Sequence, residues 1–167
     1  MNLATPAGRR RCLAGILTGT KALLLTKCNE DNMNTSTVYA ICAMSDIPSQ
    51  KAKGFLLMRV DDDGMTRPWP VVVVRWGQRV FGYVNKCPHD GVTLDWERNQ
   101  FLDPNGIRLM CGKHGALFEL GTGICVEGPC KGRSLQPVAL SIFDGDICIT
   151  DVKLVEDDEV LPNGRET

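Results

Sequence analysis

Apolar residues occur along this chain in short runs separated by turn residues, a pattern typical of β-strands. The run with the strongest β propensity is 71–76 (VVVVRW), and no segment keeps a convincing helical period over three turns. Short strands at this close spacing predict an all-β fold, a sandwich or a barrel. The predicted strands are residues 38–43, 54–60, 71–76, 79–84, 107–110, 116–120, 124–126, 138–143 and 146–150.

Two tight turns indicate that neighbouring strands pair antiparallel. Gly77-Gln78 joins strands 71–76 and 79–84, and Asp144-Gly145 joins the last two predicted strands. Both connections have the length and residue types of two-residue hairpin turns. The chain has 167 residues and a mass of 18.3 kDa, which suits one compact domain.

Charge divides the chain into three parts, although the net charge is only −1. Residues 1–32 carry +3, residues 151–167 carry −4, and the stretch between them is neutral. No basic stripe runs through the body, so nucleic-acid binding has little electrostatic support. We expect a poorly ordered N-terminal extension over residues 1–35, a folded domain over 36–152 and an acidic tail over 153–167.

The N-terminal apolar run, residues 12–25, follows three arginines. It is shorter than the roughly 20 residues that cross a bilayer, and Lys21 interrupts it, so no membrane span is predicted. It resembles an export signal or a transit peptide only in part, and no cleavage site stands out. We therefore favour an upstream extension of a cytoplasmic protein over either targeting signal.

Two short clusters contain both histidines of the chain. Cys87-Pro-His89 and Cys111-Gly-Lys-His114 each lie on a glycine-containing loop that follows a predicted strand. Two facing loops of this kind supply two thiolates and two imidazoles. Zinc accepts such a set tetrahedrally, and a [2Fe–2S] cluster accepts it with two thiolates on one iron and two imidazoles on the other. Because each cluster pairs one cysteine with one histidine, the spacing favours the iron–sulfur interpretation.

These motifs, followed by Gly128-Pro129, resemble the Rieske iron–sulfur family over about residues 38–151. The resemblance implies an antiparallel β-sandwich with a small cluster-binding subdomain and one Rieske-type [2Fe–2S] cluster. It also implies that Cys87 and Cys111 bind the inner iron, that His89 and His114 bind the outer iron, and that Gly128-Pro129 belongs to a third, covering loop.

Departures from the family pattern indicate the branch. Val92 and Lys113 stand where Rieske proteins of cytochrome bc complexes have a disulfide between the loops. Ala116 and Phe118 stand where the high-potential members have a serine and a tyrosine that donate to the cluster sulfurs. Losing both donors predicts a potential nearer about −150 mV than +300 mV.

The resemblance implies an electron-transfer protein and not an enzyme. A Rieske oxygenase needs two further histidines for a mononuclear iron, and none remains here. We expect a monomeric ferredoxin-like carrier that passes single electrons from a donor reductase to an oxygenase or another oxidoreductase. Alternatives are a permanent small subunit of a nitrite reductase or dioxygenase complex, and a zinc-stabilised interaction module.

Other conspicuous residues are predicted to be structural. Cys125 and Cys130 allow a lid disulfide or a redox pair near the cluster, but the pattern favours an ordinary buried strand residue and a loop thiol. Asp90 is interpreted as a solvated loop acid rather than a partner of the neighbouring imidazole. Trp96 is interpreted as a packing residue, and Cys42 and Cys148 as core residues.

Overall fold

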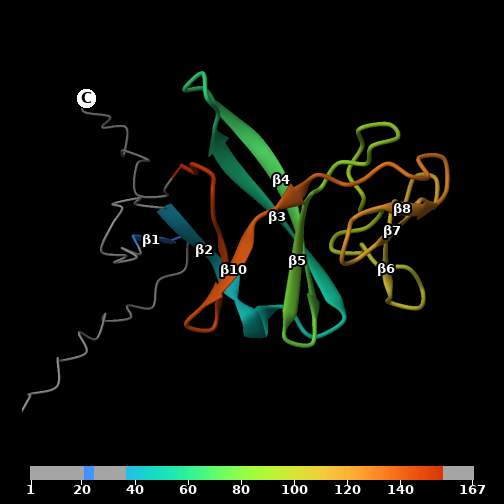
Figure 1. The fold of residues 1–167 in the computed structure, drawn as a ribbon, viewed down its shortest axis with the longest axis horizontal. Coiled ribbons are helices and arrows are strands. Elements are labelled where there is room, and N and C mark those ends of the chain that lie inside the picture. The colour runs from blue at the N-terminus through green and yellow to red at the C-terminus, as the bar shows by residue number, and fades with distance from the viewer. Residues whose placement is uncertain (1–20, 25–36, 156–167) are drawn as a thin grey trace, which may run out of the picture.

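The computed structural model describes residues 21–24 and 37–155, and these form three antiparallel sheets (Figure 1). No α-helix occurs in the described part, whose one helical turn is the 3-10 segment η1 (Met44–Asp46). The predicted all-β antiparallel architecture is confirmed. The strands are β1 (Lys21–Leu24), β2 (Thr37–Ala43), β3 (Lys51–Val60), β4 (Thr66–Trp76), β5 (Arg79–Val84), β6 (Arg108–Met110), β7 (Leu117–Glu119), β8 (Cys125–Glu127), β9 (Pro137–Val138), β10 (Leu140–Phe143) and β11 (Asp146–Ile149).

The sheets follow one another along the molecule. The first has the strand order β1-β2-β11-β10, the second β3-β4-β5-β9, and the third β6-β7-β8. Figure 1 shows the third sheet at one end, with the second sheet between it and the first.

Strand β4 is the central wall of the molecule. Val71, Val72, Val73 and Val74 have no exposed surface. Val71 and Val73 belong to the core shared with the first sheet, whereas Val72 and Val74 belong to the core shared with the third sheet. Because successive side chains of a strand point to opposite faces, burial on both sides explains an uninterrupted apolar run.

Strand β4 begins earlier than predicted, because its first half contains two prolines, which argue against a strand. Pro70 pairs with Leu56 and Pro68 with Met58 in the β3–β4 ladder, whereas the β5 ladder starts only at Val71. The Pro70 carbonyl accepts a 2.9 Å hydrogen bond from the backbone N–H of Asn85, beyond the end of β5. The backbone nitrogens and carbonyls of Pro68 and Pro70 therefore face away from β3. A missing N–H therefore costs no ladder bond with β3.

The sheets extend past the predicted domain limits of 36 and 152. Within the predicted extension, β1 pairs with β2 from Lys21 opposite Ala40 to Leu24 opposite Thr37. At the other end, Val60 donates to the Lys153 carbonyl (2.8 Å), and Leu154 is buried. The remaining predictions for residues 1–35 and for the tail from 156 onward fall outside the described residues. Across 21–24 and 37–155, no helix is long and apolar enough to span a membrane.

One buried hydrogen bond fastens the third sheet to the second. The Tyr83 hydroxyl on β5 donates to the Leu120 carbonyl, just after β7, at 2.7 Å. Tyr83 also packs in the same core as Leu109 and Phe118 of the third sheet. The small sheet and its loops are thus held at a fixed position against the end of β5.

Neighbouring valines of β4 provide a test of this two-core arrangement. We expect Val72→Ala and Val73→Ala to lower the free energy of unfolding by a similar amount, about 2 kcal/mol each, because each removes buried methyl groups. Only Val72→Ala should speed amide hydrogen exchange in β6–β8, since only Val72 lies in that core. Equal acceleration by both variants would contradict the assignment of the two faces.

Candidate metal centre

Two loops at the far end of the molecule share one backbone design. We call residues 87–92 the first loop and residues 111–116 the second loop. In the first, Cys87 N–H donates to Val92 (2.7 Å) and Gly91 N–H donates back to Cys87 (2.8 Å). In the second, the same two bonds join Cys111 to Ala116 and Gly115 to Cys111, both at 2.9 Å. In each loop the backbone of the cysteine is therefore hydrogen-bonded to the residues four and five positions later, and these two bonds close the loop.

This closure places the cysteines inside and the histidines outside. Cys87 and Cys111 are 2% and 1% exposed. The side chains of His89 and His114 are 32% and 43% exposed, and their ring centroids lie 5.0 Å apart at an interplanar angle of 74°. The structure thus brings the two imidazoles predicted from the sequence side by side at the surface.

Asp90 bridges the two loops. Its carboxylate lies 2.7 Å from Lys113 Nζ, 3.3 Å from His89 Nδ1 and 3.6 Å from His114 Nδ1. The hydrogen bond from Lys113, followed by the charges of His89 and Lys113, holds the pKa of Asp90 below its usual value. Asp90 is solvent-accessible, as predicted, but it also lies beside the neighbouring His89 ring, the alternative that the sequence disfavoured, and beside the His114 ring, which its place in the sequence did not indicate.

Burial governs the chemistry of the Cys111 thiol. Burial raises the pKa of Cys111, while hydrogen bonds from the backbone N–H groups of Lys113 and His114 act in the opposite direction. A buried thiol of this kind gives up its proton when a metal binds, and the same N–H groups then stabilise the thiolate.

Asn85 supports both loops and was missed at the level of sequence. It is buried at the end of β5, where its Oδ1 accepts from Leu94 N–H (2.7 Å) and its Nδ2 donates to Asp95 (2.9 Å). The Leu94 carbonyl in turn accepts from Gly112 N–H of the second loop (2.8 Å). The signal in the sequence was a polar amide directly after an apolar strand, two residues before Cys87.

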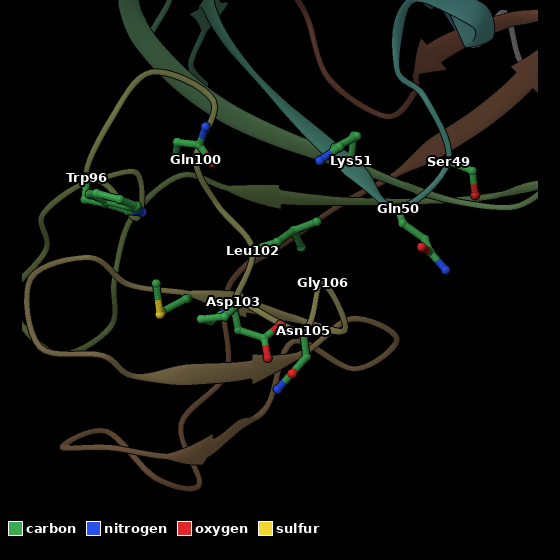
Figure 2. Close-up of a pocket in the computed structure, with 11 residues that line it drawn as sticks. Ser49, Gln50, Lys51, Trp96, Gln100, Leu102, Asp103, Asn105 and Gly106 are labelled. Atoms are coloured by element: carbon green, nitrogen blue, oxygen red, sulfur yellow. The ribbon is translucent and has the colours of Figure 1, made fainter.

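Trp96 lies against the second loop but is 58% exposed, so the prediction of a packing residue covers only part of its position. A Cβ on Gly112 would stand 2.2 Å from the Trp96 Cβ, so no other residue fits there without displacement. Trp96 also borders a cavity of about 430 Å³, shown in Figure 2, that reaches Lys51, Asp103 and Met110. None of the four predicted ligands lines this cavity.

A third loop covers the other two. We use this name for residues 128–133, which follow β8. Gly128 packs so closely that a Cβ there would lie 2.7 Å from the Ala116 Cα of the second loop. Arg133 Nη1 donates to the Pro88 carbonyl of the first loop (3.1 Å). The predicted covering position of Gly128-Pro129 agrees with these contacts.

The residues fit a [2Fe–2S] cluster by their chemistry. Two buried thiols and two exposed imidazoles, one of each from either loop, form a donor set that this cluster accepts. Ala116 and Phe118 are fully buried and carry no hydroxyl, so neither residue donates a hydrogen bond toward this centre.

Comparison with known proteins identifies the family. The model of the Rieske [2Fe-2S] domain matches residues 37–149. No curated protein matches the sequence of this chain.

Solved structures share the fold at low sequence identity. The ferredoxin of carbazole 1,9a-dioxygenase from Nocardioides aromaticivorans IC177 is 18% identical, with a TM-score of 0.51 over 66% of this chain and 93% of that chain. A chain from the complex of reduced oxygenase and oxidized ferredoxin in carbazole 1,9a-dioxygenase is 23% identical, with a TM-score of 0.51 over 71% and 97%. The terminal oxygenase of carbazole 1,9a-dioxygenase from Novosphingobium sp. KA1 is 16% identical, with a TM-score of 0.50 over 67% of this chain but 29% of that chain.

The class of protein is therefore an antiparallel β-sandwich with a cluster-binding end. The family match spans most of the chain, and the protein belongs to the Rieske [2Fe-2S] family. The predicted cofactor, one Rieske-type [2Fe–2S] cluster, is confirmed, and the zinc interpretation is set aside.

Gly112 tests how tightly the second loop is packed. We expect Gly112→Ala to lower the free energy of unfolding by about 1–3 kcal/mol and to change the fluorescence of Trp96, because the new methyl group overlaps the indole side chain. Gly121→Ala is the matched control, since a Cβ there meets no atom within 4 Å. Equal effects of the two substitutions would show that Trp96 does not constrain the loop.

Proposed function

We propose that the protein is a single-electron carrier whose [2Fe–2S] cluster is held by Cys87, His89, Cys111 and His114. One observation carries the proposal: two loops with the same backbone closure bury one thiol each and expose one imidazole each at a single end of the molecule. Bound there, the cluster supplies one-electron oxidation and reduction.

The two kinds of ligand have different tasks. Cys87 and Cys111 bind from the buried side, where their thiolates are shielded from water and Cys111 receives backbone N–H bonds. His89 and His114 bind from the exposed side and form the edge through which a docked partner exchanges electrons. Asp90 lies beside both rings, 3.3 Å from His89 Nδ1 and 3.6 Å from His114 Nδ1.

The surface around the histidines suits weakly bound partners with acidic faces. Lys86 packs over Gly91, and Arg133 reaches Pro88, so two basic side chains flank the first loop, whose own Asp90 is paired with Lys113. Lys113 and Lys131 are exposed on the second and third loops. We propose a donor reductase and an acceptor oxygenase or other oxidoreductase that dock here in turn, with electrostatic attraction raising the association rate.

We propose a separate carrier rather than a permanent subunit, a proposal supported by the likeness to a ferredoxin over nearly its whole length. The chain spans nearly the whole of the Nocardioides ferredoxin but 29% of the Novosphingobium terminal oxygenase. We therefore propose a monomeric ferredoxin-like protein of the cytoplasm that is an electron-transfer component and not itself an enzyme. Stable copurification with a large partner would instead favour a permanent subunit of a nitrite reductase or dioxygenase complex.

Substitution of the proposed ligands tests the site. We expect Cys87→Ser and Cys111→Ser to lose bound iron and sulfide, because each removes one thiolate of the set. Cys148→Ser is the matched control, since Cys148 is equally buried but lies on β11 of the first sheet, and it should retain the cluster. Iron and sulfide per chain are measured together with the electron paramagnetic resonance spectrum after dithionite reduction.

The spectrum decides the ligand type. The wild-type protein should give a rhombic signal with a low mean g and one unpaired spin per chain. His114→Cys should shift the spectrum toward that of an all-thiolate cluster or lose the cluster altogether. Unchanged spectra in His114→Cys would remove His114 from the ligand set, and a silent reduced wild type would refute the proposal.

The reduction potential tests the missing hydroxyl donors. We expect Ala116→Ser to raise the potential by about 40–60 mV, because a hydrogen bond about 1–1.4 kcal/mol stronger in the reduced state corresponds to that shift for one electron. Ala139→Ser, on an exposed residue just before β10, should leave the potential unchanged. A shift of the same size in both variants would contradict a local effect of the hydroxyl group.

A further inference from the structure

Two cysteines that the proposed ligand set does not use lie next to each other, Cys125 on β8 and Cys130 in the third loop. The Cys130 thiol points at Cys125 Sγ at a sulfur–sulfur distance of 3.3 Å, and both residues are 1% exposed. A disulfide has a sulfur–sulfur bond of about 2.05 Å, so a movement of little more than about 1 Å would close it. Cys125 is a buried strand residue and Cys130 a loop thiol, as predicted, but their contact is also the one that the alternative of a lid disulfide requires.

The backbone around the pair holds the two residues together. Cys125 N–H donates to the Arg133 carbonyl, and Gly132 N–H donates to the Cys125 carbonyl, both at 2.8 Å. Arg133 N–H also donates to the Cys130 carbonyl at 2.9 Å. The segment therefore folds back on β8 at Cys125, which fixes the distance between the two thiols.

The third loop contacts both metal-binding loops. Gly128 packs on Ala116 of the second loop with a φ of +107°, a conformation that favours glycine, and Arg133 binds Pro88 of the first loop. Cys125 and Cys130 belong to the same core as Cys87 and Cys111. A covalent bond between Cys125 and Cys130 would thus attach the third loop, which covers the candidate centre, to the third sheet.

The other described thiols outside the proposed ligand set lack this arrangement. Cys148 donates a weak hydrogen bond to the Asp146 carbonyl (3.8 Å), and Cys42 is only partly buried on β2. Cys125 also donates to the Glu127 carbonyl (3.2 Å), but it has a second thiol as neighbour. These two residues are therefore the pair placed for disulfide formation.

We propose that Cys125 and Cys130 are a thiol–disulfide redox pair whose oxidation locks the third loop over the metal-binding loops. This proposal does not depend on electron transfer by the cluster. It adds a modification site to the protein and assigns to the third loop two states, a dithiol state that can open and a disulfide state that cannot.

The oxidant is a small disulfide such as oxidised glutathione. The thiolate of one cysteine attacks the oxidant, which forms a mixed disulfide and releases one small thiol. The second cysteine attacks the mixed disulfide, which forms the Cys125–Cys130 bond and releases the second small thiol. Two protein thiols are oxidised by two electrons in total, and the oxidant takes up both electrons and both protons.

Burial sets a condition on this exchange. Both sulfurs are shielded, so the oxidant reaches them only when the third loop opens and the hydrogen bonds from Cys125 to Arg133 and from Gly132 to Cys125 break. Opening of a short surface segment is a common local fluctuation. We therefore expect oxidation to be slow in the folded protein and, once complete, to prevent further opening.

The test is a thiol map of the full, cluster-loaded chain. The protein is equilibrated in glutathione buffers from fully reduced to fully oxidised, quenched in acid, unfolded, alkylated and digested with trypsin. Residues 114–131 form one tryptic peptide that contains Cys125 and Cys130 and no other cysteine. We expect this peptide to lose both alkyl groups together as the buffer becomes oxidising, while iron per chain stays constant.

Variants separate this outcome from general oxidation. Cys130→Ser should leave Cys125 fully alkylated or joined to glutathione, whereas Cys148→Ser should behave as the wild type. The proposal is overturned if the wild-type peptide keeps both alkyl groups in every buffer, if it carries only glutathione, or if either cysteine is linked to Cys87 with loss of iron. The measurement on the wild-type protein does not depend on the folding of any variant. It detects the disulfide between Cys125 and Cys130 even if the protein transfers no electrons.

Discussion

Burial of β4 on both faces is the constraint on which the rest of the molecule depends. Val71 and Val73 close one core, Val72 and Val74 close the other, and none of the four is exposed. A strand buried on both sides needs a layer on each side. The first sheet supplies one layer, and the third sheet with its loops supplies the other. Because β5 pairs with β4 and ends at Val84, the first loop begins three residues later at a position that the central strand has already fixed.

Backbone hydrogen bonds then determine which atoms the loops bury. In each loop, hydrogen bonds join the cysteine to the residues four and five positions later, and this closure turns the thiol inward. The histidine, two or three positions after the cysteine, remains at the surface. Asn85 connects this local geometry to the sheet, since it holds Leu94, and Leu94 holds Gly112. A buried N–H without a partner costs about 1–3 kcal/mol, so this chain of bonds contributes more to the position of the loops than the exposed pair of Asp90 and Lys113.

The sequence was sufficient for the features that depend on local pattern. Apolar runs located the strands from β2 to β11 apart from their ends and apart from β9, which the predicted strand 138–143 merged with β10, and the cysteine–histidine spacing located the two loops. The first half of β4 was missed because Pro68 and Pro70 argue against a strand, and only the strand order shows that their missing N–H groups face away from β3. The contact of Trp96 with Gly112 and the role of Asn85 were missed because both depend on segments brought together by the fold.

The pair of Cys125 and Cys130 shows why spacing alone misleads. Five residues of extended chain cover about 17 Å, so the sequence favoured a strand residue and a separate loop thiol over contact between their sulfurs. The chain instead reverses after β8, because Gly128 adopts a positive φ against Ala116 and Gly132 bonds back to Cys125. The reversal that covers the metal-binding loops is therefore the same reversal that joins the thiols. Since the ion pair between the first and second loops is exposed and contributes little, the buried attachment of the third loop is the contact best placed to control access to the centre.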